Sequence, residues 1–447
     1  MVQVAKEKNI YLSNFARLDH AAVPSWLRPV RQSAMDCFAE LGFPTTREEA
    51  WRFTSVAPIA KIPFTPAEPT DLDPKALANV LRHFTFGQWS CCQLVFLNGH
   101  FSLTLSSLNA PPKGVVLHGL GTVLKQDPQK LEPYLARYAS FEEHTFVALN
   151  TAFIADGAFV YIPKGTAIEG PIHLLFISTT DGLPAMSHPR NLIIAEANSQ
   201  ARIVESYVGR EGDVYFTNAV TEIVAGENAV IDHYKLQRES IQAFHVATLQ
   251  AYQSRSANLS THSISLGGAL VRNDVNVVMD GDGCECTLNG FYMVKGHQHV
   301  DNHTTIDHAR PHGASRELYK GILDEHASGV FNGRIIVRPG AQKTDAKQTN
   351  KNLILTEDAL VNTNPQLEIH ADDVKCTHGA TIGQLDADAL FYLRSRGIDP
   401  ETARHLLTYA FASDITSRIK IETIRTGLEC TLFTKLPHGH KVTEELW

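Results

Sequence analysis

A regular spacing in the middle of the chain restricts what it can fold into. Ala201, Ala229 and Ala257 stand 28 residues apart, and Cys284 follows 27 residues later. Each comes after a polar turn sequence and precedes a stretch in which apolar and polar side chains alternate, which is typical of a β-strand with one buried face. A strand pair that stacks on its own copy and buries a shared strip has such a period. The spacing therefore predicts a β-solenoid, with an ordinary β-sandwich as the alternative.

The repeat becomes less regular toward the C-terminus. Similar turns recur at His326-Ala327-Ser328 and at Asp358-Ala359-Leu360, at intervals that would require insertions. Upstream, alternation begins near residue 90, where Asn98-Gly99 predicts a tight hairpin between two strands. We therefore expect a mainly β core over residues 89–385.

Helical patterns flank this core. Apolar side chains at helical spacing predict a helix over residues 24–41 that ends near Gly42. Asp399-Pro400-Glu401 combines an N-cap acid with a first-turn proline and is typical of a helix start. These patterns predict an N-terminal helical domain over residues 1–88 and a C-terminal helical domain over residues 386–447.

Composition disfavours several classes of function. The 40 Lys and Arg residues against 48 Asp and Glu residues give a net charge of −8, which argues against nucleic-acid binding. No apolar run is long enough for a membrane span, and the first residues show no targeting pattern, so we expect a cytoplasmic protein. The seven cysteines form no C-x-x-C pair. The run from Gly340 to Thr344 lacks the second glycine of a phosphate-binding loop, so any ATP chemistry needs another protein.

Three segments resemble a known family. They are G-F-P-T-T-R-E-E-A-W-R-F-T at 42–54, the run F-V-A-L-N-T-A-F-I-A-D-G at 146–157 with its continuation to 165, and the block 331–398. All are similar to the SufB/SufD family of iron–sulfur cluster assembly proteins. C-T-H-G-A-T at 376–381 is similar to the SufD branch, because the SufB branch typically has a glutamate where Gly379 stands. The resemblance implies a right-handed parallel β-helix flanked by helical domains, and a scaffold without enzymatic activity.

The resemblance also implies partners and cofactors. A SufD-like chain pairs with SufB, and each binds a copy of the ATPase SufC through its C-terminal helices. Together they support iron acquisition and the formation of a nascent iron–sulfur cluster, and a reduced flavin is associated with the complex. We expect a transient cluster shared with SufB and no tightly bound cofactor in the isolated chain. Because an unpaired strand edge invites another chain, we also expect a homodimer through the edge holding Leu367, Ile369 and Val374.

Cys376 and His378 are the main candidates for cluster chemistry. On a strand, residues i and i+2 share a face, and thiolate and imidazole both suit iron–sulfur chemistry. Two ligands do not complete a four-ligand site, so the remaining ligands must come from a partner, which the resemblance identifies as SufB. Val374 shares the same face, so burial in a core is the alternative for both side chains.

Two further groups of residues have metal-like or sulfur-like character. His297, His299 and His303, followed by His308 and His312, are candidate metal ligands for an alternative function as a metal-dependent hydrolase. Interleaved charged residues make a polar surface the favoured interpretation. Cys284 and Cys286 share a strand face and form a candidate sulfur relay, although buried structural positions are favoured. A carbohydrate-active β-helix enzyme is the second alternative, and it would need paired carboxylates in a groove.

The C-terminal helical pattern has one apolar stripe that extends to Ile419. Helices at the end of a solenoid either cap it or meet a partner. We predict that the following four residues of the stripe hold the ATPase: Leu406, Leu407, Phe411 and Ile415.

Overall fold

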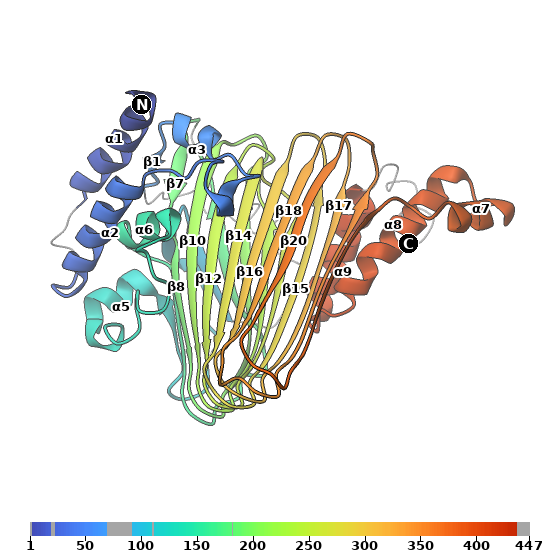
Figure 1. Ribbon diagram of the computed structural model, residues 1–447. Helices are drawn as coiled ribbons and strands as arrows, with labels where there is room; N and C mark the ends of the chain where they lie inside the picture. The colour runs from blue at the N-terminus through green and yellow to red at the C-terminus, as the bar shows by residue number, and fades with distance from the viewer. Residues whose placement is uncertain (1, 19–22, 69–91, 110, 181, 436–447) are drawn as a thin grey trace.

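The computed structural model describes residues 2–18, 23–68, 92–109, 111–180 and 182–435. Its body is a β-solenoid of about eight turns, built from two long sheets that enclose a packed interior (Figure 1). The boundary predicted between residues 88 and 89 lies outside the described residues.

Sheet A consists, in spatial order, of β20 (Leu360–Ile369), β18 (Ser328–Val337), β16 (His299–His308), β14 (Leu270–Met279), β12 (Phe244–Gln253), β10 (Tyr215–Ala225), β8 (Arg190–Ala195), β5 (Ala158–Ile162) and β4 (Val116–Gly119), with β1 (Thr65–Pro66) and β7 (Ala185–Ser187) at its margin. Sheet B consists of β21 (Lys375–Gly383), β19 (Asp345–Ile354), β17 (Ala314–Leu323), β15 (Glu285–Val294), β13 (Asn258–Ser265), β11 (Val230–Arg238), β9 (Gln200–Gly209), β6 (Ile172–Ser178), β2 (Cys92–Leu97) and β3 (His100–Ser107).

Parallel pairing distinguishes this fold from a β-sandwich. From β9 onward the chain alternates between the two sheets, and each strand pairs in parallel with the strand one turn earlier. Within the described residues, antiparallel pairing joins β2 to β3 and β4 to β5. The β2–β3 hairpin turns at Asn98 and Gly99, whose φ angles of 52° and 85° fit the predicted tight turn. The solenoid prediction is confirmed, and the sandwich alternative is wrong.

The register shows what the 28-residue spacing represents. Ala229, Ala257 and Cys284 each directly precede mutually paired strand residues, so they occupy one corner of successive turns. Ala201 pairs with Ile231 and lies two residues farther along its turn. Ala327 and Ala359 occupy the equivalent place on sheet A, before Ser328 and Leu360, so they belong to the opposite corner. Ser328 and Leu360 are 32 residues apart, whereas the paired His299 and Ser328 are 29 apart.

One corner of the solenoid is built from a stack of left-handed residues. Their φ angles lie between 56° and 70°, and each backbone N–H donates to a carbonyl of the next turn. This conformation is tolerated best by Gly and Asn and otherwise costs conformational energy. The residues are Asn198, Asn228, Ser256, Gly283, His312 and Lys343.

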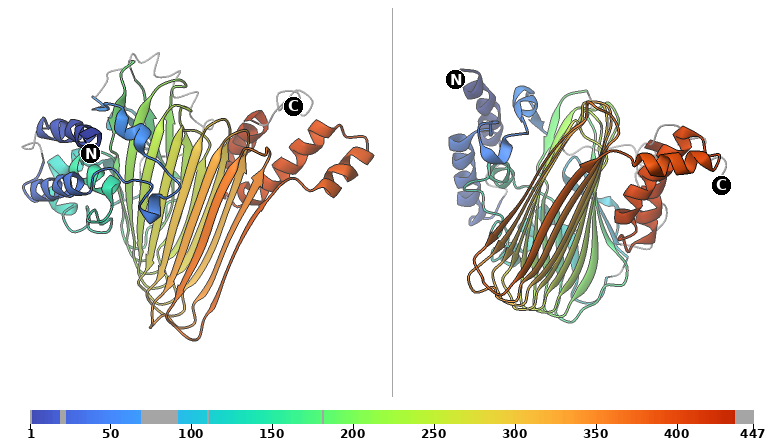
Figure 2. Two further views of the ribbon diagram at one scale, coloured as in Figure 1. Left: turned by 45° about the horizontal axis from the view of Figure 1, so that its top comes forward. Right: turned by 45° about the vertical axis from the view of Figure 1, so that its right-hand side comes forward.

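The N-terminal helices cover the outer face of sheet A near its start (Figures 1 and 2). They are α1 (Val2–Ala16), α2 (Leu27–Leu41), η2 (Glu49–Trp51) and α3 (Ala57–Lys61). The helix predicted from residue 24 begins at Leu27 and ends as expected before Gly42, whose φ is 67°.

Further helices interrupt the region that we predicted as a mainly β core. They are α5 (Leu120–Gln126), η3 (Pro128–Lys130) and α6 (Thr145–Ala152). Every residue of α6 from Phe146 to Ala152 is buried, because the helix lies between α2 and sheet A. A helix buried on all sides has no polar face, so its sequence lacks helical periodicity.

C-terminal helices follow on the other side of the solenoid, and the last two of them pack against the outer face of sheet B (Figure 2). They are α7 (Ala387–Ser395), α8 (Pro400–Thr416) and α9 (Glu422–Lys435). As predicted, Asp399 caps α8 by accepting hydrogen bonds from the backbone N–H groups of Glu401 and Thr402. None of the described helices is long and apolar enough to cross a membrane.

Candidate functional site

The solenoid ends in an uncovered turn formed by β20 and β21. These strands are the last in their sheets among the described residues, so side chains that would point into the interior remain partly exposed. Among these inward side chains, Ile369 and Ile382 have exposed fractions of 41% and 47%. One turn earlier, the inward residues of β19 are buried. We call this uncovered turn the open end.

Cys376 and His378 both lie at the open end, on β21. Cys376 pairs with Ala346 and packs beside Ala371 and Val374, so it is half-buried. Burial raises the pKa of the Cys376 thiol, which favours the protonated form at neutral pH. His378 is exposed. The two side chains therefore share a strand face, but only the cysteine is partly in a core.

Beneath His378 the same inward column continues into the solenoid. His378 pairs with Gln348 of β19, and Gln348 pairs with Glu317 of β17. Gln348 Nε2 donates to Glu317 Oε2 at 2.7 Å, and burial raises the pKa of Glu317 to about 7. We did not predict these residues as part of the site. Alternation alone would place them wrongly, because apolar Leu318 points outward under α8 and α9 while Glu317 points inward.

The histidine-rich stretch does not gather around one point. His297 lies in a turn and stacks on His326, whereas His299 bonds to Thr54 and Ser328 at 2.8 and 2.7 Å. His303 lies 3.1 Å from Asp301. His308 bonds to a serine in the interior, and His312 is one of the left-handed corner residues. Within the described part of the chain, no group of three or more His, Cys, Asp or Glu side chains could hold a metal ion.

Cys284 and Cys286 are buried structural residues. Their exposed fractions are 0% and 2%, and both belong to the main hydrophobic core of the solenoid. Burial raises the pKa of both thiols, so neither is prepared to act as a nucleophile at neutral pH. The favoured structural interpretation fits this environment.

The predicted ATPase surface is divided by the structure. Ile415 is fully buried against sheet B, so it packs on the chain's own sheet and does not belong to an exposed surface. Phe411 is partly buried, with the Lys320 ammonium 4.2 Å from its ring centre. Leu407 is half-buried, and Leu406 is 43% exposed. The four residues of the stripe do not form one exposed surface, because most of the stripe packs on the chain's own sheet.

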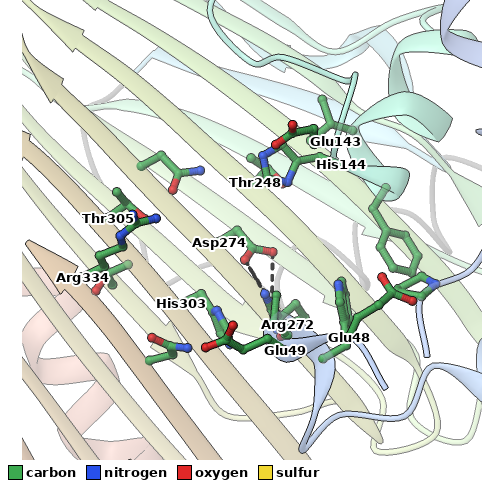
Figure 3. A pocket seen from close by; sticks show the side chains of 18 of the residues that line it. Glu48, Glu49, Glu143, His144, Thr248, Arg272, Asp274, His303, Thr305 and Arg334 are labelled. Atoms are coloured by element: carbon green, nitrogen blue, oxygen red, sulfur yellow. Dashed lines mark hydrogen bonds and ion pairs between the residues drawn. The ribbon is translucent and has the colours of Figure 1, made fainter. Parts of the chain in front are cut away.

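A cleft of about 530 Å³ lies where the N-terminal segment crosses sheet A (Figure 3). Two of its acidic groups, Asp274 and Glu368, are held in ion pairs. Arg272 is bonded to Asp274 and stacks 4.3 Å from the ring centre of Trp51. Arg334 forms two 2.7 Å bonds with Glu368. Carboxylates held in ion pairs are poorly suited to acid–base hydrolysis. These two carboxylates therefore give little support to a carbohydrate-active enzyme.

Comparisons with known proteins cover nearly the whole chain. Residues 6–174 match the SufBD protein N-terminal region, and residues 176–411 match the SufBD core domain of SUF system FeS cluster assembly. An iron–sulfur cluster assembly SufBD family protein of Synechocystis is 38% identical, with 89% of this chain and 88% of that protein covered. A chloroplastic protein of Arabidopsis thaliana is 32% identical, with 89% and 84% covered. The iron–sulfur cluster assembly protein SufD of Escherichia coli is 29% identical, with 92% and 93% covered.

Proposed function

The chain belongs to the SufBD family of iron–sulfur cluster assembly proteins, and from this membership we propose that it is the SufD-type scaffold subunit of a Suf complex. In this role it pairs with SufB, binds the ATPase SufC and has no enzymatic activity of its own. It supports iron acquisition and the formation of a nascent cluster at the interface with SufB. The cluster is cargo that passes through the interface, and the reduced flavin belongs to the complex rather than to the isolated chain. We place the complex in the cytoplasm.

The open end is the single observation that carries this proposal. It combines unpaired strand edges with exposed apolar side chains and with His378, whose imidazole can ligate iron. Cys376 lies beside it, and one chain supplies too few ligands for a cluster. A second SufBD chain that continues the sheets would cover the apolar residues and complete the ligand set. In isolation, the same edge favours a homodimer.

Pairing through the open end predicts a large effect for Ile382→Asp. Burying an isoleucine stabilises an interface by roughly 1.5–3 kcal/mol, so a buried aspartate should weaken both the homodimer and the pairing with SufB at least about tenfold. Sedimentation measures the homodimer, and co-purification of the tagged chain from its native cell measures SufB. Unchanged association in both measurements would contradict pairing at this end.

The ATPase is proposed to dock on α7 and the exposed side of α8. Phe391 and Tyr392 on α7 are 73% and 57% exposed, and Leu406 is the exposed member of the predicted stripe. Leu406→Asp is expected to weaken SufC binding roughly tenfold, because it places a charge in an apolar contact. A pull-down titration measures this affinity. Leu103→Asp, on the equally exposed β3 strand, is the matched control.

The two variants also control for each other in one co-purification experiment. Ile382→Asp should lose SufB and retain SufC, whereas Leu406→Asp should lose SufC and retain SufB. If neither SufB nor SufC co-purified with the wild-type chain, the proposed function would be overturned.

A further inference from the structure

The interior beneath the open end is polar. β19 carries three inward carboxamides, Gln348, Asn350 and Asn352, with exposed fractions of 1%, 0% and 3%. Asn352 Nδ2 donates to Asn350 Oδ1 at 2.6 Å, and Tyr292 donates its hydroxyl to Asn352. Buried polar groups are costly unless they are hydrogen-bonded, so a layer of them directly under an exposed surface calls for an explanation.

Gln348 is the member of this layer that lies directly beneath His378. Its amide is fixed from below by the 2.7 Å bond from Nε2 to Glu317 Oε2. Beside it, Gly333 of sheet A leaves room for the amide, since a Cβ atom at this position would stand only 2.4 Å from Gln348 Nε2. A side chain at position 333 would therefore displace the amide. The sequence thus provides space for Gln348 in this orientation.

This orientation leaves an acceptor without a partner. Gln348 Oε1 is buried and has no hydrogen-bond partner within the described part of the chain, and the same holds for Glu317 Oε1. An unsatisfied buried acceptor costs roughly 1–3 kcal/mol, so a donor supplied next to it would be favoured. The next side chain in the column is His378, one strand spacing away, at about 4.8 Å.

We propose that Glu317, acting through Gln348, positions the imidazole of His378 and selects its tautomer. The chain of donors runs from one ring N–H of His378 to Gln348 Oε1, and from Gln348 Nε2 to Glu317. The other ring nitrogen then keeps its lone pair and faces the open end, where iron would bind. Bonds of this kind from a ligating histidine orient the ring and raise its basicity. Glu317 and Gln348 are positioning residues, and their assignment rests on the proposed role of His378.

The tautomer of His378 can be measured without any cluster. The chain is labelled with ¹⁵N-histidine and studied by NMR at pH 8, alone and paired with SufB. One tautomer of His378 should dominate in the wild type. Gln348→Met removes the acceptor and Glu317→Gln frees the amide to turn over, so each should reduce the tautomer ratio by roughly threefold or more, as expected for losing one hydrogen bond. Glu368→Gln, an exposed charge change on the neighbouring β20, should leave the ratio unchanged.

Two variants keep the inference testable if one of them folds poorly, and melting curves identify such a variant. An unchanged tautomer ratio in a folded Gln348→Met or Glu317→Gln chain would overturn the positioning role. This result is separate from the proposed function. If His378 proved dispensable for clusters, the function would fall while the measured tautomer effect would stand.

Discussion

Replacing Glu222 by alanine is expected to destabilise the folded chain by about 3–5 kcal/mol, because the change leaves a buried arginine without its counter-charge. Arg190 and Glu222 are both fully buried, and Arg190 donates to Glu222 Oε2 at 2.8 and 3.1 Å. Glu222 also accepts from the backbone N–H groups of Ala136, Tyr138 and Ala139 at 2.9–3.0 Å. One carboxylate thus fastens the segment between η3 and α6 to sheet A.

Urea unfolding curves of the isolated chain measure this loss. The double variant Arg190→Met/Glu222→Leu is the informative partner, because replacing a buried pair by apolar residues is often neutral or stabilising. It should recover much of the stability, less the contribution of the three backbone hydrogen bonds. Glu368→Ala breaks a solvent-exposed ion pair with Arg334 and should cost much less stability than Glu222→Ala. A loss of stability for Glu222→Ala no larger than that for Glu368→Ala would mean that the pair does not anchor the segment.

The part of the fold that the sequence predicted well depends on repeated local chemistry. Corner residues such as Asn228 and Ser256 recur because every turn needs a left-handed residue there, and alternating strands follow each corner. The exact period was less regular than the 28-residue spacing indicated. Paired positions differ by 30 residues between Gln200 and Val230 and by 27 between Asn258 and Glu285, because corner loops vary in length.

The sequence pattern did not show which strand faces are covered by helices. Alternation identifies a buried face only where the other face meets water, and the helices remove that condition on parts of both sheets. On sheet B, Leu318 faces outward beneath α8 and α9, so polar Glu317 takes the interior position. The same covering buries Ile415 on its own sheet instead of presenting it to a partner. Cys376 and His378 could be assigned to the site from the family resemblance together with strand periodicity. Assigning Gln348 required the register between strands, which the sequence does not show.

His378→Ala is expected to reduce the cluster occupancy of the reconstituted complex by roughly tenfold or more while leaving the isolated chain folded. Loss of a group that binds or orients a metal ligand typically costs 10–100-fold. The side chain is exposed at the open end, so its removal creates no cavity, and the free energy of unfolding should fall by no more than about 1.5 kcal/mol, the contribution of one hydrogen bond to Gln348. Thermal melting of the isolated chain and iron and sulfide analysis of the complex provide the two measurements.

The exposure of His378 makes the two interpretations of this residue easy to separate. If His378 only stabilised the core, its replacement by alanine would lower the melting temperature and leave cluster occupancy normal. That combination of results would contradict its functional assignment. Thr377→Ala is the matched control, since Thr377 is the exposed neighbour on the opposite face of β21 and should affect neither measurement. Cys376→Ala is expected to have the smaller functional effect, because burial raises the pKa of its thiol and keeps it protonated. If docking of the partner exposed the Cys376 thiol, Cys376→Ala should reduce cluster occupancy about as much as His378→Ala. Comparing the cluster occupancy of these two variants in the assembled complex therefore also reports how far the open end rearranges.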